Sequence, residues 1–295
     1  MKITRVASLV LFLLLSIRIV SNGQMLTDSV LVDNHYRTFH FNKPSGSNKT
    51  SSLIFILHGS GGSGVGQSKA ATKLEALAET ENLLLVYPDG YKHFWNECRK
   101  MSSSEANAID INENGFFNSM IEYFTSKYKV RTGQVFAIGT SGGGHMAYKL
   151  ALTMPGKFKA ITAIIANLPD APNMDCVESK VPIAVMIING TTDPVNPYEG
   201  GEVKISIATL GTVRSTEETF KYWANLGGYS GNPSKENVPD SDPADGKTVE
   251  RYTYKSKGKP EVVLLKVVNG KHDYPNDIDV NVEAWNFFKR QIELR

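Results

Sequence analysis

One short stretch of this chain has the residue types of a serine nucleophile site: Gly139-Thr140-Ser141-Gly142-Gly143. An apolar run, 135–138, precedes it, and a helical pattern from His145 to Leu152 follows it. A GxSxG between a strand and a helix suits a sharp, strained turn that leaves the serine hydroxyl exposed above a sheet. The sequence therefore predicts Ser141 as a nucleophile, against the alternative of an ordinary glycine-rich turn.

A serine hydroxyl needs a base to take its proton, and the base needs an acid to hold it in the right tautomer. In a nucleophile elbow the chain order is serine, acid, histidine, so the base must follow Ser141. Only His145 and His272 do so. His145 lies one turn along the helix that starts at the nucleophile, whereas His272 lies on a loop after a strand. We predict His272 as the base; the alternative is a loop histidine bonded to Asp273.

The acid is predicted by elimination. Asp193 is the only carboxylate between Ser141 and His272 that directly follows a strongly apolar strand pattern, 181–188. The other aspartates lie in a proline-containing loop, in a polar insertion or beside the base, at positions 170, 175, 240, 242, 245 and 273. We predict Asp193 as the acid, with the cap of an Asx-turn as the alternative.

A second glycine-rich loop, 58–62 (HGSGG), follows the apolar run 53–57. Such a loop lets backbone N–H groups approach a developing negative charge. We predict the N–H groups of Ser60 and Gly142 as the oxyanion hole. A phosphate loop would need a GK[ST] ending, which 64–67 lacks, and the remaining alternative is a flexible linker.

Strand and helix patterns alternate along most of the chain. An antiparallel edge is expected over 28–41, with a turn near 33–34, and the surface loop after it carries an Asn-Lys-Thr sequon at 48–50. This succession predicts an α/β fold with a mostly parallel sheet covered by helices on both faces and reactive loops at the strand carboxyl ends. The expected strands are 53–57, 83–87, 135–138, 161–165, 181–188, 249–255 and 262–268; the expected helices are 69–81, 116–128, 145–152, 217–226 and 280–294; and 227–247 is expected to be an irregular loop.

The first residues form a leader pattern: Lys2 and Arg5, an apolar run from Val6 to Val20, and a small-residue cleavage pattern, 21–23. We predict a signal peptide over 1–23 and a single catalytic domain over 24–295, secreted or periplasmic. The apolar run is too short and interrupted for a membrane span, so no integral anchor is expected after cleavage. In an oxidising compartment Cys98 and Cys176 can pair, but spacing alone leaves a disulfide and two free thiols both open.

Composition limits the partners. The chain has 32 basic and 30 acidic residues, three of the basic ones in the leader, so the mature surface is close to neutral. Without a basic run, neither nucleic acid nor an anionic membrane is expected as the main partner. The stretch 240–246 is similar to a calcium loop, but its third Asp and its Gly stand one place late, so we expect a solvated turn. No metal or organic cofactor is expected.

With these residues in place, the chain resembles the secreted polyhydroxybutyrate depolymerase and feruloyl esterase family of α/β-hydrolases from about Leu53 to the C-terminus. The resemblance rests on LHGSGG (57–62), YPDG with a downstream Trp95-Asn96, the start of a helix at 114–116, GTSGGGHMAY, NGTTDPVNPYEGG and GKHDYP. It independently implies Asp193 as the acid and His272 as the base. The chain departs from the family at Gly142, where Asn or Gln is common, and at 269–272, where GGGH is common.

The resemblance implies an α/β-hydrolase fold and an exported serine esterase that acts on feruloyl or acetyl esters of polysaccharide or on polyhydroxyalkanoate oligomers. For such ligands we expect an aromatic surface made of Tyr91, Trp95, Tyr198 and Tyr274. Two rival functions stay open: a serine peptidase of the same fold, and a catalytically silent carbohydrate-binding protein.

Overall fold

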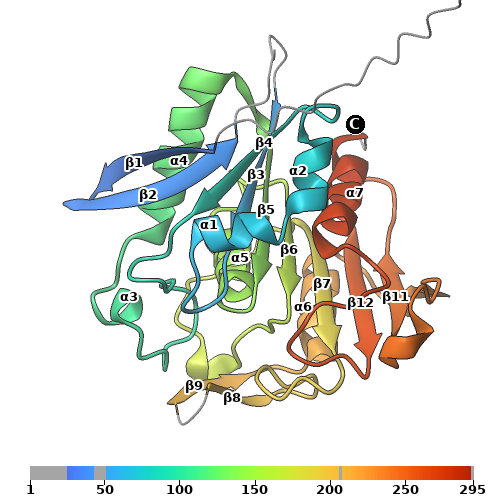
Figure 1. Cartoon of the computed structure of the whole chain (residues 1–295). Helices are drawn as coiled ribbons and strands as arrows, with labels where there is room; N and C mark the ends of the chain where they lie inside the picture. The colour runs from blue at the N-terminus through green and yellow to red at the C-terminus, as the bar shows by residue number, and fades with distance from the viewer. Residues whose placement is uncertain (1–24, 43–50, 206–207, 294–295) are drawn as a thin grey trace, which may run out of the picture.

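The computed structural model describes residues 25–42, 51–205 and 208–293, so the leader 1–23 and the sequon at 48–50 lie outside the described residues. Within those ranges, one ten-stranded sheet runs through the molecule in the order β1-β2-β4-β3-β5-β6-β7-β12-β11-β10 (Figure 1). Its strands are β1 (Leu26–Val32), β2 (His35–Asn42), β3 (Ser51–Leu57), β4 (Leu83–Pro88), β5 (Val130–Thr140), β6 (Ala160–Ile164), β7 (Ala184–Gly190), β10 (Ser234–Asn237), β11 (Thr248–Tyr254) and β12 (Val262–Val268).

The six central strands, from β4 to β12 in the sheet order, are parallel to one another. Antiparallel strands close both edges, with β1 and β2 at one edge and β11 and β10 at the other. The mostly parallel α/β sheet and the antiparallel edge near residues 28–41 are therefore confirmed. Because the central strands share one direction, their carboxyl ends lie along one edge of the sheet, and the loops that follow them meet there.

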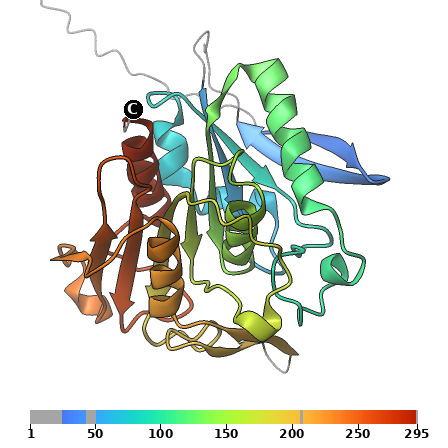
Figure 2. The same cartoon turned by 180° about the vertical axis from the view of Figure 1, so that it is seen from behind.

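Helices cover both faces of the sheet. On one face lie α4 (Glu113–Tyr128), α5 (Gly142–Thr153) and α6 (Thr216–Leu226), which Figure 2 shows in front; on the other lie α1 (Gly64–Lys69), α2 (Thr72–Ala78) and α7 (Val280–Glu293), in front in Figure 1. A short α3 (Glu105–Ala108) lies in the loop after β4, and 3-10 turns span Ala171–Asn173 and Pro243–Asp245.

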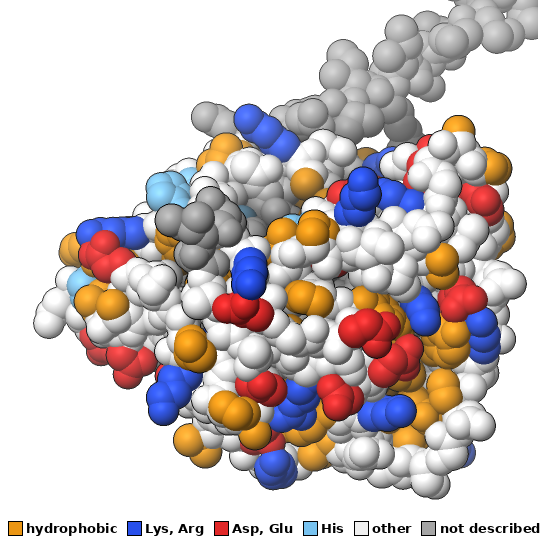
Figure 3. All heavy atoms as spheres, turned by 90° about the horizontal axis from the view of Figure 1, so that it is seen from below, with side chains coloured by type: hydrophobic (Ala, Val, Ile, Leu, Met, Phe, Trp, Pro, Cys, Tyr) orange, Lys and Arg blue, Asp and Glu red, His pale blue; other side chains and the backbone are white. Residues whose placement is uncertain are grey.

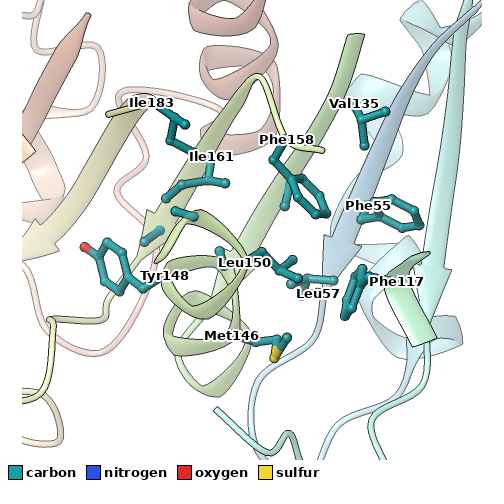
Figure 4. Close-up of a cluster of buried hydrophobic side chains, with 14 of the residues drawn as sticks. Phe55, Leu57, Phe117, Val135, Met146, Tyr148, Leu150, Phe158, Ile161 and Ile183 are labelled. Carbon is teal, nitrogen blue, oxygen red and sulfur yellow. The ribbon is translucent and has the colours of Figure 1, made fainter. Parts of the chain in front are cut away.

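The strands divide their side chains between two cores. In β3, Phe55 and Leu57 face the α4–α5–α6 side, whereas Ile54 and Ile56 face the other side. This alternation is the two-residue period of a strand buried on both faces, and it explains why 53–57 reads as an uninterrupted apolar run. Figure 4 shows the first core, where Phe55, Phe117, Phe158 and Ile161 surround α5.

Three local expectations are wrong. The helix expected over 69–81 is shorter, spanning only α2 (Thr72–Ala78), and a separate short helix, α1, precedes it. Ser63 caps α1, where its side chain accepts the N–H of Gly66. The loop 227–247 contains β10, which pairs with β11. A two-stranded sheet, β8 (Gly201–Ile205) with β9 (Ala208–Val213), has no counterpart among the expected elements.

Cys98 and Cys176 are joined in a disulfide, with their Cα atoms 5.0 Å apart. The bond fastens the loop after β4 to the segment after β6, and backbone hydrogen bonds also join these two segments.

No helix in the described ranges is both long and apolar enough to cross a bilayer.

Candidate active site

Ser141 lies at the turn between β5 and α5, and its backbone is strained. Its φ of 53° and ψ of −116° fall outside the regions that a residue with a Cβ normally adopts. The turn is held by two backbone bonds: Ser141 N–H donates to Ile164 O (2.8 Å), and His145 N–H donates to Ser141 O (3.0 Å). The predicted strand, turn and helix around the serine are all present.

Close packing at the turn requires glycine after the serine. A Cβ on Gly143 would lie 2.4 Å from Leu57 O, and a Cβ on Gly142 would lie 2.5 Å from Ser60 Oγ and 2.9 Å from Ser60 N. The start of α5 therefore packs directly against the end of β3 and the loop 58–62. That approach sets the Gly142 and Ser60 backbones against each other.

Ser141, His272 and Asp193 form one hydrogen-bonded chain. His272 Nε2 lies 3.0 Å from Ser141 Oγ, and His272 Nδ1 lies 2.7 Å from Asp193 Oδ2. A carboxylate can only accept, so Nδ1 carries the proton that it donates to Asp193, and Nε2 is left to accept the serine hydroxyl. The three residues predicted from the sequence are brought together in the geometry of a nucleophile, a base and an orienting acid.

The acid is fixed by its own turn. Asp193 is buried, and its Oδ1 accepts the N–H groups of Val195 (2.8 Å) and Asn196 (2.9 Å) while Oδ2 receives His272. The Asx-turn that the sequence offered as an alternative is thus also present, on the other carboxylate oxygen. It locks the carboxylate plane so that one oxygen points at the histidine.

The loops after β7 and β12 are tied together. Thr192 donates both its N–H and its Oγ1–H to Gly270 O, each at 2.9 Å, and Asn269 N–H donates to Thr191 Oγ1 at 2.9 Å. Asp273 accepts from Lys247 Nζ at 3.0 Å, and within the described ranges its side chain does not bond His272, whose ring nitrogens bond Asp193 and Ser141. These bonds hold the acid and the base at a fixed separation.

The loop 58–62 is anchored by His58. Its Nδ1–H donates to Gly59 O (2.7 Å), and its Nε2 accepts Gly90 N–H (2.9 Å). Burial lowers the pKa of His58, which favours the neutral ring that this pair of bonds requires. Trp95 Nε1–H also donates to His58 O (2.9 Å). In the part of the chain that the structure describes, the N–H groups of Ser60 and Gly142 have no protein acceptor.

A cavity of about 340 Å³ opens beside Ser60 and Gly142. Small-molecule sites commonly have volumes of roughly 300–1,000 Å³. Its wall comes from the loop after β4 and from the β8–β9 hairpin, and consists of Ser60, Phe94, Trp95, Glu97, Arg99, Ser102, Ser103, Ser104, Glu105, Gly142, Ile205 and Leu210. The sequence around the hairpin residues, Glu97 and Arg99 contains no recognisable motif. It therefore could not predict that these residues line a cavity.

The four aromatic residues do not form one surface. Trp95 lines the cavity, but Tyr198 is 3% exposed and donates its hydroxyl to Glu217 Oε1 (2.9 Å), so its prediction as an exposed contact is wrong. Tyr91 packs edge-on against His35, and the Tyr274 hydroxyl bonds Thr140 Oγ1 (2.6 Å). Contacts of Tyr91 and Tyr274 with a ligand stay predictions.

Figure 3 views the molecule from the side at which β7 and β12 end. Acidic, basic and apolar side chains are interspersed across this face, without one continuous block of basic charge.

His145, the histidine not chosen as the base, is buried on α5, and its Nδ1 has no partner among the described residues. Burial holds the pKa of His145 well below its usual range, with the charges of Arg99 and His272 acting in the same direction.

Comparison with known families decides the affiliation of the chain. The sequence profile described as "Phospholipase/Carboxylesterase" matches residues 42–221, more than half of the chain. The chain belongs to this family of α/β-hydrolases. The resemblance to esterases that the motifs indicate is therefore confirmed.

Individual relatives are distant. The chain is 27% identical over 234 residues to a putative esterase, NocK, from Nocardia uniformis, covering 76% of this chain and 65% of that protein. It is 30% identical over 172 residues to a probable feruloyl esterase C from Aspergillus terreus, covering 56% and 58%. The chain thus spans less than two thirds of the length of these curated relatives.

The fold has a counterpart among solved structures. An acetyl xylan esterase from Aspergillus awamori superposes with a TM-score of 0.62 at 16% identity, covering 89% of this chain and 99% of that one. At this identity the likeness concerns the fold alone.

Proposed function

We propose that this chain is an exported serine esterase that cleaves carboxylic esters through an acyl-enzyme. The observation that carries the proposal is the chain of hydrogen bonds from Ser141 Oγ through His272 to Asp193. Beside it lie two N–H groups that have no acceptor among the described residues. Membership of the carboxylesterase family and the names of the relatives support it.

In the proposed reaction Ser141 Oγ attacks the ester carbonyl carbon while His272 Nε2 takes the hydroxyl proton. Asp193 holds the ring in place and stabilises the imidazolium that forms. The carbonyl oxygen becomes an oxyanion, which accepts the N–H groups of Ser60 and Gly142. Removing one such donor costs roughly 10²–10³-fold in rate in a well-studied protease, which is the scale expected of this hole.

Collapse of the tetrahedral intermediate expels the alcohol, to which His272 returns the proton, and leaves an ester between the acyl group and Ser141. Water then attacks this ester with His272 again as the base, which frees the acid product and restores the serine. The chain's own residues supply every proton transfer in this sequence.

The substrates that we propose are feruloyl or acetyl esters on polysaccharide, or polyhydroxyalkanoate oligomers. The relatives named as feruloyl and acetylxylan esterases favour the first two. We further propose 1–23 as an export signal and 24–295 as one catalytic domain. The disulfide supports export, because such bonds persist mainly in oxidising compartments.

Hydrolysis of p-nitrophenyl acetate by wild type and by Ser141→Ala tests the reaction. We expect the variant to lose about 10³-fold or more in kcat, because it lacks the hydroxyl that attacks the ester. Ser126→Ala, an exposed serine on α4, is the matched control and should keep full activity. Equal activity of wild type and Ser141→Ala would refute the nucleophile. Release of ferulate, acetate or hydroxybutyrate from polymers then separates the substrates, and cleavage of peptides alone would overturn the esterase proposal.

A further inference from the structure

The cavity beside the oxyanion donors is placed to receive the acyl part of a substrate. Ser60 and Gly142 contribute to its wall, whereas His272 does not. The leaving alcohol must lie next to His272, which protonates it. With the carbonyl oxygen held by the two N–H groups, the alcohol points toward the histidine and the acyl group points into the cavity. This step rests on the proposed function.

The apolar part of the wall consists of Trp95, Phe94, Ile205 and Leu210. Phe94 and Ile205 are partly exposed and lie toward the solvent, whereas Trp95 is buried. Trp95 cannot swing freely, because its Nε1–H is bonded to His58 O and its ring lies 4.9 Å from the His58 ring. A two-carbon acyl group would leave most of the 340 Å³ cavity vacant. The walls therefore fit a larger acyl group, and aromatic walls favour a flat one.

One charged pair interrupts the apolar wall. Arg99 donates its Nε–H to Glu97 Oε1 (2.8 Å) and its backbone N–H to Glu97 Oε2 (2.9 Å), and both side chains are at most 4% exposed. Glu97 thereby fixes the plane of the guanidinium. Such a buried ion pair is costly to desolvate and gives little net stability by itself. Stability alone therefore does not explain why the pair lies beside a cavity.

The terminal nitrogens of Arg99 are unused by the protein. In the described ranges neither Nη1 nor Nη2 has a hydrogen-bond partner, yet neither is sealed from solvent, unlike Nη1 of Arg37. Because Arg99 lines the cavity and is only 3% exposed, its accessible N–H groups face that cavity. These N–H groups can therefore donate hydrogen bonds to an acceptor on a ligand that fills the cavity.

We propose that Arg99 is a specificity-determining residue that donates hydrogen bonds to a neutral oxygen substituent at the far end of a flat acyl group, with Glu97 as its positioning residue. A neutral oxygen is favoured over a carboxylate because Glu97 already balances the guanidinium. A hydroxyl or methoxy group on an aryl ring has the required chemistry.

The test compares methyl esters of cinnamic acid, 4-methoxycinnamic acid and 4-carboxycinnamic acid. For wild type, we expect kcat/KM for the methoxy ester to exceed that for the unsubstituted ester, mainly through KM. In the pair variant Glu97→Gln/Arg99→Met, which leaves no charge unpaired, this selectivity should fall by roughly 10- to 100-fold, the range for a hydrogen bond from a charged donor. Activity on the unsubstituted ester should persist, which shows that the variant is folded.

A second pair serves as the matched control. Glu261→Gln/Arg290→Met removes an ion pair of the same residue types (3.0 Å) on the α7 side of the sheet, and it should leave the selectivity ratio unchanged. A purely structural role for Arg99 would lower activity on both neutral esters equally and would overturn the proposal. Preference for the carboxylated ester would overturn the assignment of a neutral oxygen. Absence of any Ser141-dependent hydrolysis would instead refute the esterase itself.

Discussion

Gly142 has two roles in the proposed site. Its N–H is one of the two proposed oxyanion donors, and its missing Cβ lets Ser60 approach to within the space that a side chain would occupy. The proposed oxyanion hole thus depends on the contact between two loops.

Gly142→Ala should test this contact. The new Cβ would lie 2.5 Å from Ser60 Oγ and 2.9 Å from Ser60 N, and only the first atom can move cheaply. We expect the loop 58–62 to shift and kcat for p-nitrophenyl acetate to fall about 10- to 100-fold. This decrease is smaller than that for complete removal of one oxyanion donor, because the shifted N–H groups can still donate.

Adding Ser60→Gly to that variant removes the Oγ clash but leaves the backbone clash, so only partial recovery of kcat is expected. Full activity of Gly142→Ala alone would contradict the role given to this contact.

At this scale the reacting residues are predictable and the pocket residues are not. Ser141, Asp193 and His272 each follow a strand in the required order, so chain order and elimination bring them together. Glu97 and Arg99 lie in a polar loop without a repeating pattern, and only the fold shows that they end at a cavity. The expected exposure of Tyr198 is wrong because a tyrosine in a loop is usually exposed, whereas this side chain is buried and its hydroxyl bonds Glu217.

Among the elements, the loop after β4 depends on its disulfide. Cys98 lies between Glu97 and Arg99, and Lys100 and Met101 donate N–H groups to the segment around Asn173. The bond closes a loop with a sequence separation of 78 residues. It therefore fastens one wall of the cavity to the segment after β6.

The variant Cys98→Ser/Cys176→Ser should lower the free energy of unfolding by about 2–4 kcal/mol, because the unfolded chain regains the entropy that the crosslink removes. Urea denaturation measures this, and reduction of the wild type should reproduce the result. Activity on p-nitrophenyl acetate should survive at 25 °C, since Ser141, His272 and Asp193 lie outside the crosslinked wall. An unchanged unfolding free energy would contradict this account.

The strands that the sequence predicts are those with long apolar runs. The buried strands β3, β4, β6 and β12 have mostly apolar sequences, with only Ser51, Ser52, Thr162 and Lys266 as polar exceptions, and this composition points to burial on both faces. The β8 strand has four of its five residues exposed, so its sequence carries no such signal. It forms by pairing with β9, the next strand along the chain.

For the whole molecule, two buried histidines make stability depend on pH. Burial lowers the pKa of both His58 and His145, so both stay neutral in the fold at a pH that protonates them in the unfolded chain, below about 6.5. The unfolded state then binds more protons, so each contribution to stability is present above pH 6.5 and is lost as the pH falls toward the folded-state pKa.

His145→Met isolates one contribution. Below pH 6.5 the unfolding free energy of the variant should rise relative to wild type by up to about 1.4 kcal/mol per pH unit, because the variant has no proton to gain. Chemical denaturation of both proteins at pH 7.5, 6.0 and 5.0 measures the difference. Between pH 7.5 and 9 the difference should stay constant, and a constant difference throughout would contradict the assignment of a neutral buried histidine.

The left-handed backbone at Ser141 separates what the scaffold favours from what the chemistry requires. At φ 53° and ψ −116° the residue that fits best is glycine, which has no Cβ to strain. A design procedure that ranks residues by their fit to this backbone will therefore favour glycine over the proposed nucleophile. Stabilised versions of this protein need position 141 held fixed by hand, because sequence optimisation for the fold alone leads away from the enzyme.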